Sequence, residues 1–126
     1  MAIRLSVPCI VLIISLTVSI SEAKRIAPKK VTPVVRNGIE YRAPATQMGC
    51  VEAWDTKTKQ LIWRKQIYVV KYTIGLERCV QDVYIKSLRF EDGSLIIANE
   101  IGYEYRLDSE TLNVEVLKGK LVLERK

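Results

Sequence analysis

The 126-residue sequence contains no histidine and has only three cysteines, six glycines and four prolines. The lack of histidine excludes Ser-His-Asp and Cys-His catalysis, imidazole metal sites and the usual side-chain switch near neutral pH. Three cysteines are too few for a cysteine-rich zinc site. A glycine-rich phosphate loop and an Asn-x-Ser/Thr glycosylation site are also missing. The sequence therefore predicts a protein that is not an enzyme and that holds no cofactor or metal.

The one long apolar run lies at the N-terminus. A basic residue, Arg4, precedes it, and Ser21-Glu22-Ala23 places small residues where a signal peptidase cuts. The run from Leu5 to Ile20 is shorter than the roughly 20 residues that a spanning helix needs. We therefore expect residues 1–23 to be a signal peptide cleaved after Ala23, and the protein to be secreted or periplasmic. The alternative is an uncleaved membrane anchor.

Positive charge dominates, with a net charge of +6, and part of it is concentrated in a proline-containing tail over residues 24–33. Four cations in this tail are candidate contacts for a polyanion: Lys24, Arg25, Lys29 and Lys30. Such a tail can bind anionic lipid at a membrane surface or an anionic envelope polymer. The simpler interpretation is a solvated tail, and nucleic acid is not expected as the partner of an exported protein.

Residues 34–126 form one β domain in this interpretation. Apolar and polar residues alternate with a period of two, and turn pairs such as Asn37-Gly38 and Asp92-Gly93 separate the runs. The pattern predicts an all-β fold: an antiparallel meander of about seven to eight strands, arranged as two blade-like sheets or a small sandwich. We expect long strands over 64–74 and 79–90, the latter with a register change near Ser87.

Removal of the signal peptide would leave two cysteines, Cys50 and Cys79. An even number in an exported chain favours one disulfide bond between them. Free thiols are the alternative.

Aromatic side chains give the best hint of a binding surface. Six tyrosines and two tryptophans are more than a core of this size needs, and exposed aromatics favour protein or carbohydrate contacts. The candidate surface consists of Trp54, Tyr68, Tyr72, Tyr103 and Tyr105. For Trp54 the alternative is a place at the edge of the core.

Two turns in the sequence match each other. Residues Trp54–Thr58 and Leu107–Thr111 share an apolar residue, Asp, a hydroxyl residue, any residue and Thr, about 50 residues apart. Together with Trp63, the first copy resembles the repeat of quinoprotein-like (PQQ-like) β-propellers. The chain departs from that repeat at Lys59, where the family has glycine, and the second copy has neither the glycine nor the tryptophan. The resemblance implies a blade-like meander in which Trp63 packs between sheets, without the quinone dehydrogenase activity.

Three functions follow as hypotheses. The favoured one is a secreted or periplasmic non-catalytic β-module that binds a protein or an envelope component through strand edges or aromatic side chains. The alternatives are a subunit or relative of a quinoprotein, and a basic binder of polyanions or membrane surfaces. Unpaired strand edges also suggest a homo-oligomer.

Overall fold

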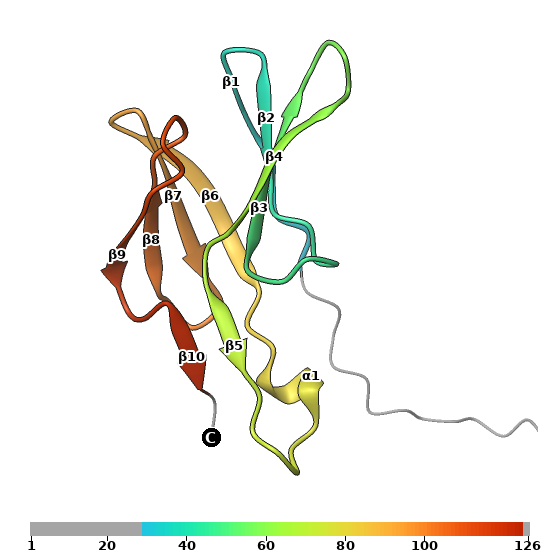
Figure 1. The fold of residues 1–126 in the computed structure, drawn as a ribbon, viewed down its shortest axis with the longest axis vertical. Helices are drawn as coiled ribbons and strands as arrows, with labels where there is room; N and C mark the ends of the chain where they lie inside the picture. The colour runs from blue at the N-terminus through green and yellow to red at the C-terminus, as the bar shows by residue number, and fades with distance from the viewer. Residues whose placement is uncertain (1–28, 125–126) are drawn as a thin grey trace, which may run out of the picture.

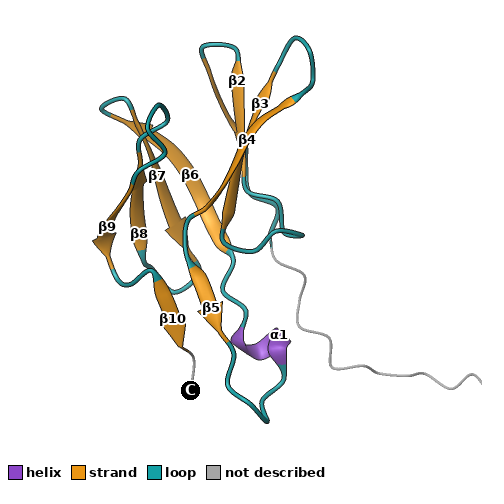
Figure 2. Cartoon of the chain, viewed as in Figure 1, coloured by secondary structure: helices purple, strands orange, loops and turns teal. Residues whose placement is uncertain are grey.

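The computed structural model describes residues 29–124, and the chain there is all-β, as predicted (Figures 1 and 2). The elements are β1 (Val34–Arg36), β2 (Ile39–Arg42), β3 (Cys50–Asp55), β4 (Leu61–Gln66), β5 (Val69–Lys71), α1 (Arg78–Gln81), β6 (Ile85–Glu91), β7 (Ser94–Asn99), β8 (Glu104–Leu107), β9 (Val114–Lys118) and β10 (Val122–Glu124). The described part thus has ten strands, more than the seven to eight that were predicted.

Eight of these strands form two four-stranded antiparallel meanders. The first sheet has the order β1-β2-β3-β4, and the second has the order β6-β7-β8-β9. The two sheets pack against one shared hydrophobic core (Figure 1). The prediction of a purely antiparallel meander was wrong for the C-terminus, because β10 returns to pair in parallel with β5.

The first and third turns of the two sheets match in backbone structure, whereas the second connections differ in length, at residues 43–49 and 100–103. In the first hairpin of each sheet, Asn37-Gly38 and Asp92-Gly93 all have positive φ, which is the requirement of a type I′ turn. In the third turn, the Asp55 carboxylate accepts the backbone N–H groups of the second and third residues after it at 2.8 and 3.0 Å. The Asp108 carboxylate does the same at 2.8 and 3.1 Å. The internal match found in the sequence is therefore also a match in structure.

Residues that correspond between the two sheets face opposite environments. Trp54 directly precedes the Asp55 turn and points away from the core, on the same face as Glu52. Leu107 directly precedes the Asp108 turn and is fully buried in the core. The first hairpins show the same reversal, since Ile39 packs on the core whereas Ser94 lies on the face opposite to buried Leu95. Equivalent faces of the two sheets therefore point in the same direction, with one sheet stacked behind the other.

The core contains two tyrosines that were predicted to be exposed. Tyr68 and Tyr105 are 2% and 0% exposed, and their rings stack with centroids 5.4 Å apart. Both hydroxyls donate to backbone carbonyls, that of Tyr68 to Val83 at 2.6 Å and that of Tyr105 to Lys120. Burial of a tyrosine is favourable when its hydroxyl has a partner, so these two stabilise the fold and form no surface.

The predicted long strands over 64–74 and 79–90 were only partly correct. The first is interrupted after Gln66, because Ile67 and Tyr68 turn into the core before β5 crosses to β10. The second begins as the short helix α1, and β6 starts only at Ile85. The predicted register change is confirmed, between Ile85 and Ser87.

The predicted signal peptide and the tail residues Lys24 and Arg25 lie outside the described residues. Between residues 29 and 124, no helix is long and apolar enough to cross a membrane.

Candidate functional site

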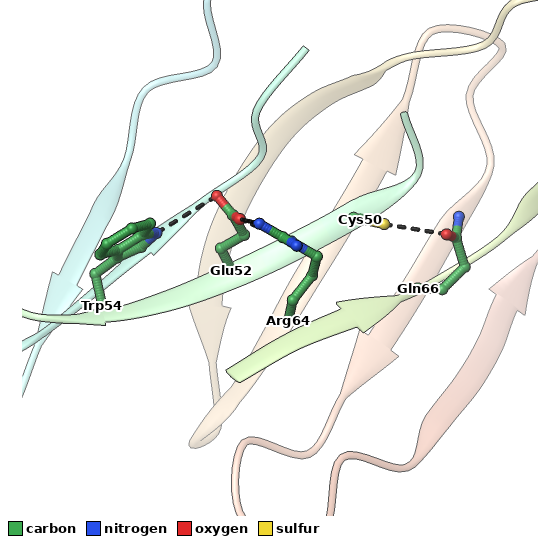
Figure 3. A network of polar contacts seen from close by, with 5 residues as sticks. All are labelled: Cys50, Glu52, Trp54, Arg64 and Gln66. Carbon is green, nitrogen blue, oxygen red and sulfur yellow. Dashed lines mark hydrogen bonds and ion pairs between the residues drawn. The ribbon is translucent and has the colours of Figure 1, made fainter. Parts of the chain in front are cut away.

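The outward face of the first sheet carries a row of interacting polar side chains (Figure 3). Alternation along β3 places Cys50, Glu52 and Trp54 on this face. Their cross-strand partners on β4 are Arg64, opposite Glu52, and Gln66, opposite Cys50. We call these five residues the polar row.

Glu52 is at the centre of the polar row. Its side chain is only 7% exposed, although no strand covers this face in the described part of the chain. The carboxylate accepts the Nε of Arg64 at 2.8 Å and the indole Nε1 of Trp54 at 3.4 Å. A carboxylate buried to this extent is costly unless it is paired, and these two donors supply the pairing.

Arg42 on β2 extends the row to one side. Its guanidinium lies 4.9 Å from the centroid of the Trp54 ring, a cation–π distance. Its Nε donates to Glu40 at 2.7 Å. This bond from Arg42 holds the pKa of the Glu40 carboxyl below its ordinary value. Arg42 is thus fixed in position by two partners.

Cys50 has a free thiol, so the predicted disulfide bond with Cys79 is absent from the structure. In place of a disulfide bond, Sγ of Cys50 lies across the strand pair and donates to Oε1 of Gln66 at 3.0 Å (Figure 3). Burial raises the pKa of the Cys50 thiol. The thiol is therefore protonated at neutral pH and is a poor nucleophile.

A cavity of about 340 Å³ lies between residues 29–33, the loop between β2 and β3, and the start of β6, and Arg42 of the outward face also lines it. Its lining is mostly apolar and includes Val31, Pro33, Ala43, Pro44, Met48 and Ile85. Three cations also line it: Lys29, Lys30 and Arg42. The predicted polyanion contacts Lys29 and Lys30 are thus placed beside an apolar cavity.

Gly49, which lines this cavity, allows the loop between β2 and β3 to approach the backbone after β4 closely. Its φ is +74°, and a Cβ at this position would lie 2.5 Å from the backbone oxygen of Tyr68. Gln66 holds the same loop by donating from Nε2 to the carbonyl of Met48 at 3.2 Å. The loop can approach the end of β4 this closely only because residue 49 has no side chain.

The predicted aromatic surface does not form as one patch. Tyr68 and Tyr105 are in the core, and Tyr72 and Tyr103 are half-buried on other elements. The Tyr72 hydroxyl donates to Asp82, whereas Tyr103 packs on the core. Only Trp54 lies beside the cavity, through its contact with Arg42.

Several residues of the site were not predicted from the sequence: Arg42, Glu52, Arg64, Gln66 and Met48. The alternation in Cys50–Trp54 was a usable signal, because it places a carboxylate between a thiol and an indole on one face. The partners Arg64 and Gln66 depend on strand register, which the sequence pattern left open.

The described residues contain no group of three or more Cys, Asp or Glu side chains that could hold a metal ion. The Glu52 carboxylate is engaged by Arg64 and Trp54, and Cys50 has an amide partner and no base. An apolar cavity with cations on its lining is suited to a ligand that has both an apolar part and a negative charge.

Comparison with known proteins adds no relative: the chain matches no protein-family model and no curated protein.

Proposed function

We propose that the protein is a non-catalytic binding module, exported from the cell, that binds an amphiphilic anion of the cell envelope. The observation that carries the proposal is the cavity of about 340 Å³, with its apolar lining and its three cations. Its size lies in the range of small-molecule sites, roughly 300–1,000 Å³.

The proposed ligand is a single-chain amphiphile with an anionic head group. Its chain would displace water from the surface formed by Val31, Met48 and Ile85, which is favourable for apolar area. Its head group would meet Lys29 and Lys30. Arg42 is already held by Glu40 and Trp54, so little side-chain entropy is lost when it contacts an anion.

Titration with dodecyl phosphate below its micellar concentration tests this proposal. Because Arg42 lies over the Trp54 ring, we expect binding to change the tryptophan emission, and isothermal calorimetry gives the affinity. Two changes should weaken binding: Lys29→Ala with Lys30→Ala, by about tenfold or more through loss of charge-assisted contacts, and Ala45→Trp, by filling the cavity.

The matched control is Lys57→Ala with Lys118→Ala, which removes two exposed cations away from the cavity and should leave the affinity unchanged. If dodecyl phosphate does not bind, or if both lysine pairs weaken binding equally, the cavity is not a ligand site.

We also propose that the two sheets are related as successive blades, as the resemblance to quinoprotein-like propellers implies. The matching Asp55 and Asp108 turns support this, and so do the equivalent faces that point in one direction. The outward faces are charged, which favours a finite two-sheet stack over a subunit of a closed ring. An absorbance spectrum of purified protein with only Tyr and Trp bands is expected, and a bound quinone chromophore would contradict it.

Oligomerisation stays a proposal. The outer edges of β1 and β9 have no partner strand in the described part of the chain, and a second copy could pair with one of them. Measurement of the mass in solution tests this.

A further inference from the structure

A second cavity, of about 490 Å³, adjoins the apolar one. The two cavities share part of their lining, because Lys29, Lys30 and Ile85 line both. The other residues that line the second cavity are Thr32, Lys86 and Glu100. The second cavity can therefore receive the polar end of a ligand whose chain lies in the first.

A β-bulge brings Lys86 to the lining of this second cavity. In the ladder between β6 and β7, Ile85 pairs with Asn99 and Ser87 pairs with Ala98, so Lys86 is the extra residue. Consecutive residues of a regular strand point to opposite faces, yet Ile85 and Lys86 both line the cavity. Bulges redirect side chains in this way. The bulge thus adds a third lysine to the two that precede β1.

The lining of the second cavity has an excess of positive charge. Three lysines and one glutamate line it, so the formal net charge of the lining is three minus one, or +2. The hydroxyl of Thr32 can donate a hydrogen bond to an anionic oxygen. Ammonium groups therefore come from two separate segments, the residues before β1 and the bulge of β6. This arrangement favours a compact anion that has several acceptor oxygens.

We propose that the second cavity binds the head group of the ligand, and that this head group is a phosphate monoester. The inference rests on the proposed function, because the first cavity would hold the chain. A phosphate monoester carries close to two negative charges above its second pKa of about 6, and it presents three acceptor oxygens. Its charge matches that of the cavity lining. A phosphodiester has a single negative charge, so it would leave part of the positive charge unmatched.

Calorimetric titration with two ligands of equal chain length tests this inference. Dodecyl phosphate is a monoester and methyl dodecyl phosphate is a diester, and both are used below their micellar concentrations at about pH 8, where the monoester carries both charges. The monoester should bind about tenfold more tightly, because its extra charge strengthens its hydrogen bonds to the lysines. Lys86→Ala should weaken binding of the monoester about tenfold and that of the diester less, so that most of the preference is lost.

The matched control is Lys118→Ala, which removes an exposed lysine from β9, at the other edge of the same sheet. It should leave both affinities unchanged. Because both lysines are exposed, both variants should fold, and circular dichroism checks this. Equal affinities for the two ligands, or equal effects of the two variants, would overturn the inference and leave the proposed function intact. If neither ligand binds, the proposed function and the inference both fail.

Discussion

The two four-stranded sheets have the same strand order and matching first and third turns, yet they use opposite faces for the core. In the first sheet the face of Trp54 and Glu52 is turned outward, and in the second the equivalent face, that of Leu107 and Tyr105, is buried. The residues that form the turns are thus repeated in the two sheets, whereas the side chains on equivalent faces differ according to whether the face is buried or exposed. A stack of two sheets has two ends, and each end face must be compatible with water.

The two outward faces solve this problem in different ways. On the second sheet, Ile96 is 1% exposed outside the core and lies between Arg89 and Arg106 in the strand register. Both arginines also form ion pairs, with Glu104 at 3.7 Å and Glu115 at 3.1 Å. On the first sheet the central position is a carboxylate, Glu52, beside an indole. Arg42, which lies against Trp54 on the first face, also lines the cavity of about 340 Å³.

The largest expected effect comes from truncation at the equivalent positions that precede the two Asp turns. Leu107→Ala should lower the free energy of unfolding by about 2–5 kcal/mol, because it leaves a cavity in the core. Trp54→Ala should cost only about 1 kcal/mol, because one face of the ring meets Arg42 rather than the core. Urea denaturation of both variants measures the difference, and equal costs would show that the two faces are equally buried.

A smaller effect is expected for glycines with positive φ in the two sheets. Gly49→Ala should destabilise by about 2–3 kcal/mol through backbone strain and a clash with the Tyr68 carbonyl. Gly93→Ala, where nothing lies within 4 Å of the added Cβ, should cost only the left-handed conformation, about 1 kcal/mol. Thermal unfolding of the two variants measures the difference. A Gly49 variant as stable as the Gly93 variant would contradict the close approach of residue 49 to the Tyr68 carbonyl.

Next come the ion pairs of the outward faces. Glu52→Gln should cost about 1–2 kcal/mol, because the Glu52 side chain is 7% exposed and is bonded to Arg64. Glu115→Gln on the second sheet, where the side chain is 64% exposed, should change stability by less than about 0.5 kcal/mol. A measured cost for Glu115 that equals that for Glu52 would contradict the difference in burial.

The smallest effect, and the one that should be the same in both sheets, concerns the turn aspartates. The pKa of Asp55 is lowered by the backbone N–H groups of Thr58 and Lys57, and that of Asp108 by those of Thr111 and Glu110. Their stabilising contribution is therefore present above the ordinary value of about 3.9 and is lost as the pH falls through the lowered pKa. In Asp55→Asn and in Asp108→Asn, the free energy of unfolding should fall less steeply below about pH 4 than in the unchanged protein. Acid denaturation should show the same reduction in slope for both variants. Unequal slopes would contradict the match between the turns.

Local signals in the sequence were sufficient to predict the all-β class, the Asn-Gly and Asp-Gly turns and the bulge near Ser87, but not the number of strands or the breaks within 64–74 and 79–90. These features depend on neighbours in the chain, and the rules for them are strong. The sequence could not show which face of each sheet is buried, because Trp54 and Leu107 occupy the same local pattern. The disulfide and the aromatic surface were wrong for the same reason: the partners of Cys50, Tyr68 and Tyr105 are side chains and carbonyls distant in sequence.

The site was partly predictable. Lys29 and Lys30 stood out as charges and now line the cavity. The role of Gln81, which is 1% exposed and bonds to backbone groups of Thr73, Leu76 and Glu77, could not be foreseen, because a glutamine in a predicted strand carries no signal for a buried amide.

Hydroxyl-radical footprinting of the unmodified protein, read residue by residue by mass spectrometry, tests the stacking of the two sheets most directly. With each rate normalised to the intrinsic reactivity of the amino acid, we expect Trp54 to be oxidised readily, while Leu107 and Tyr105 are protected. Equal protection of Trp54 and Leu107 would mean that equivalent faces both point inward, and the stacked arrangement of the sheets would be wrong.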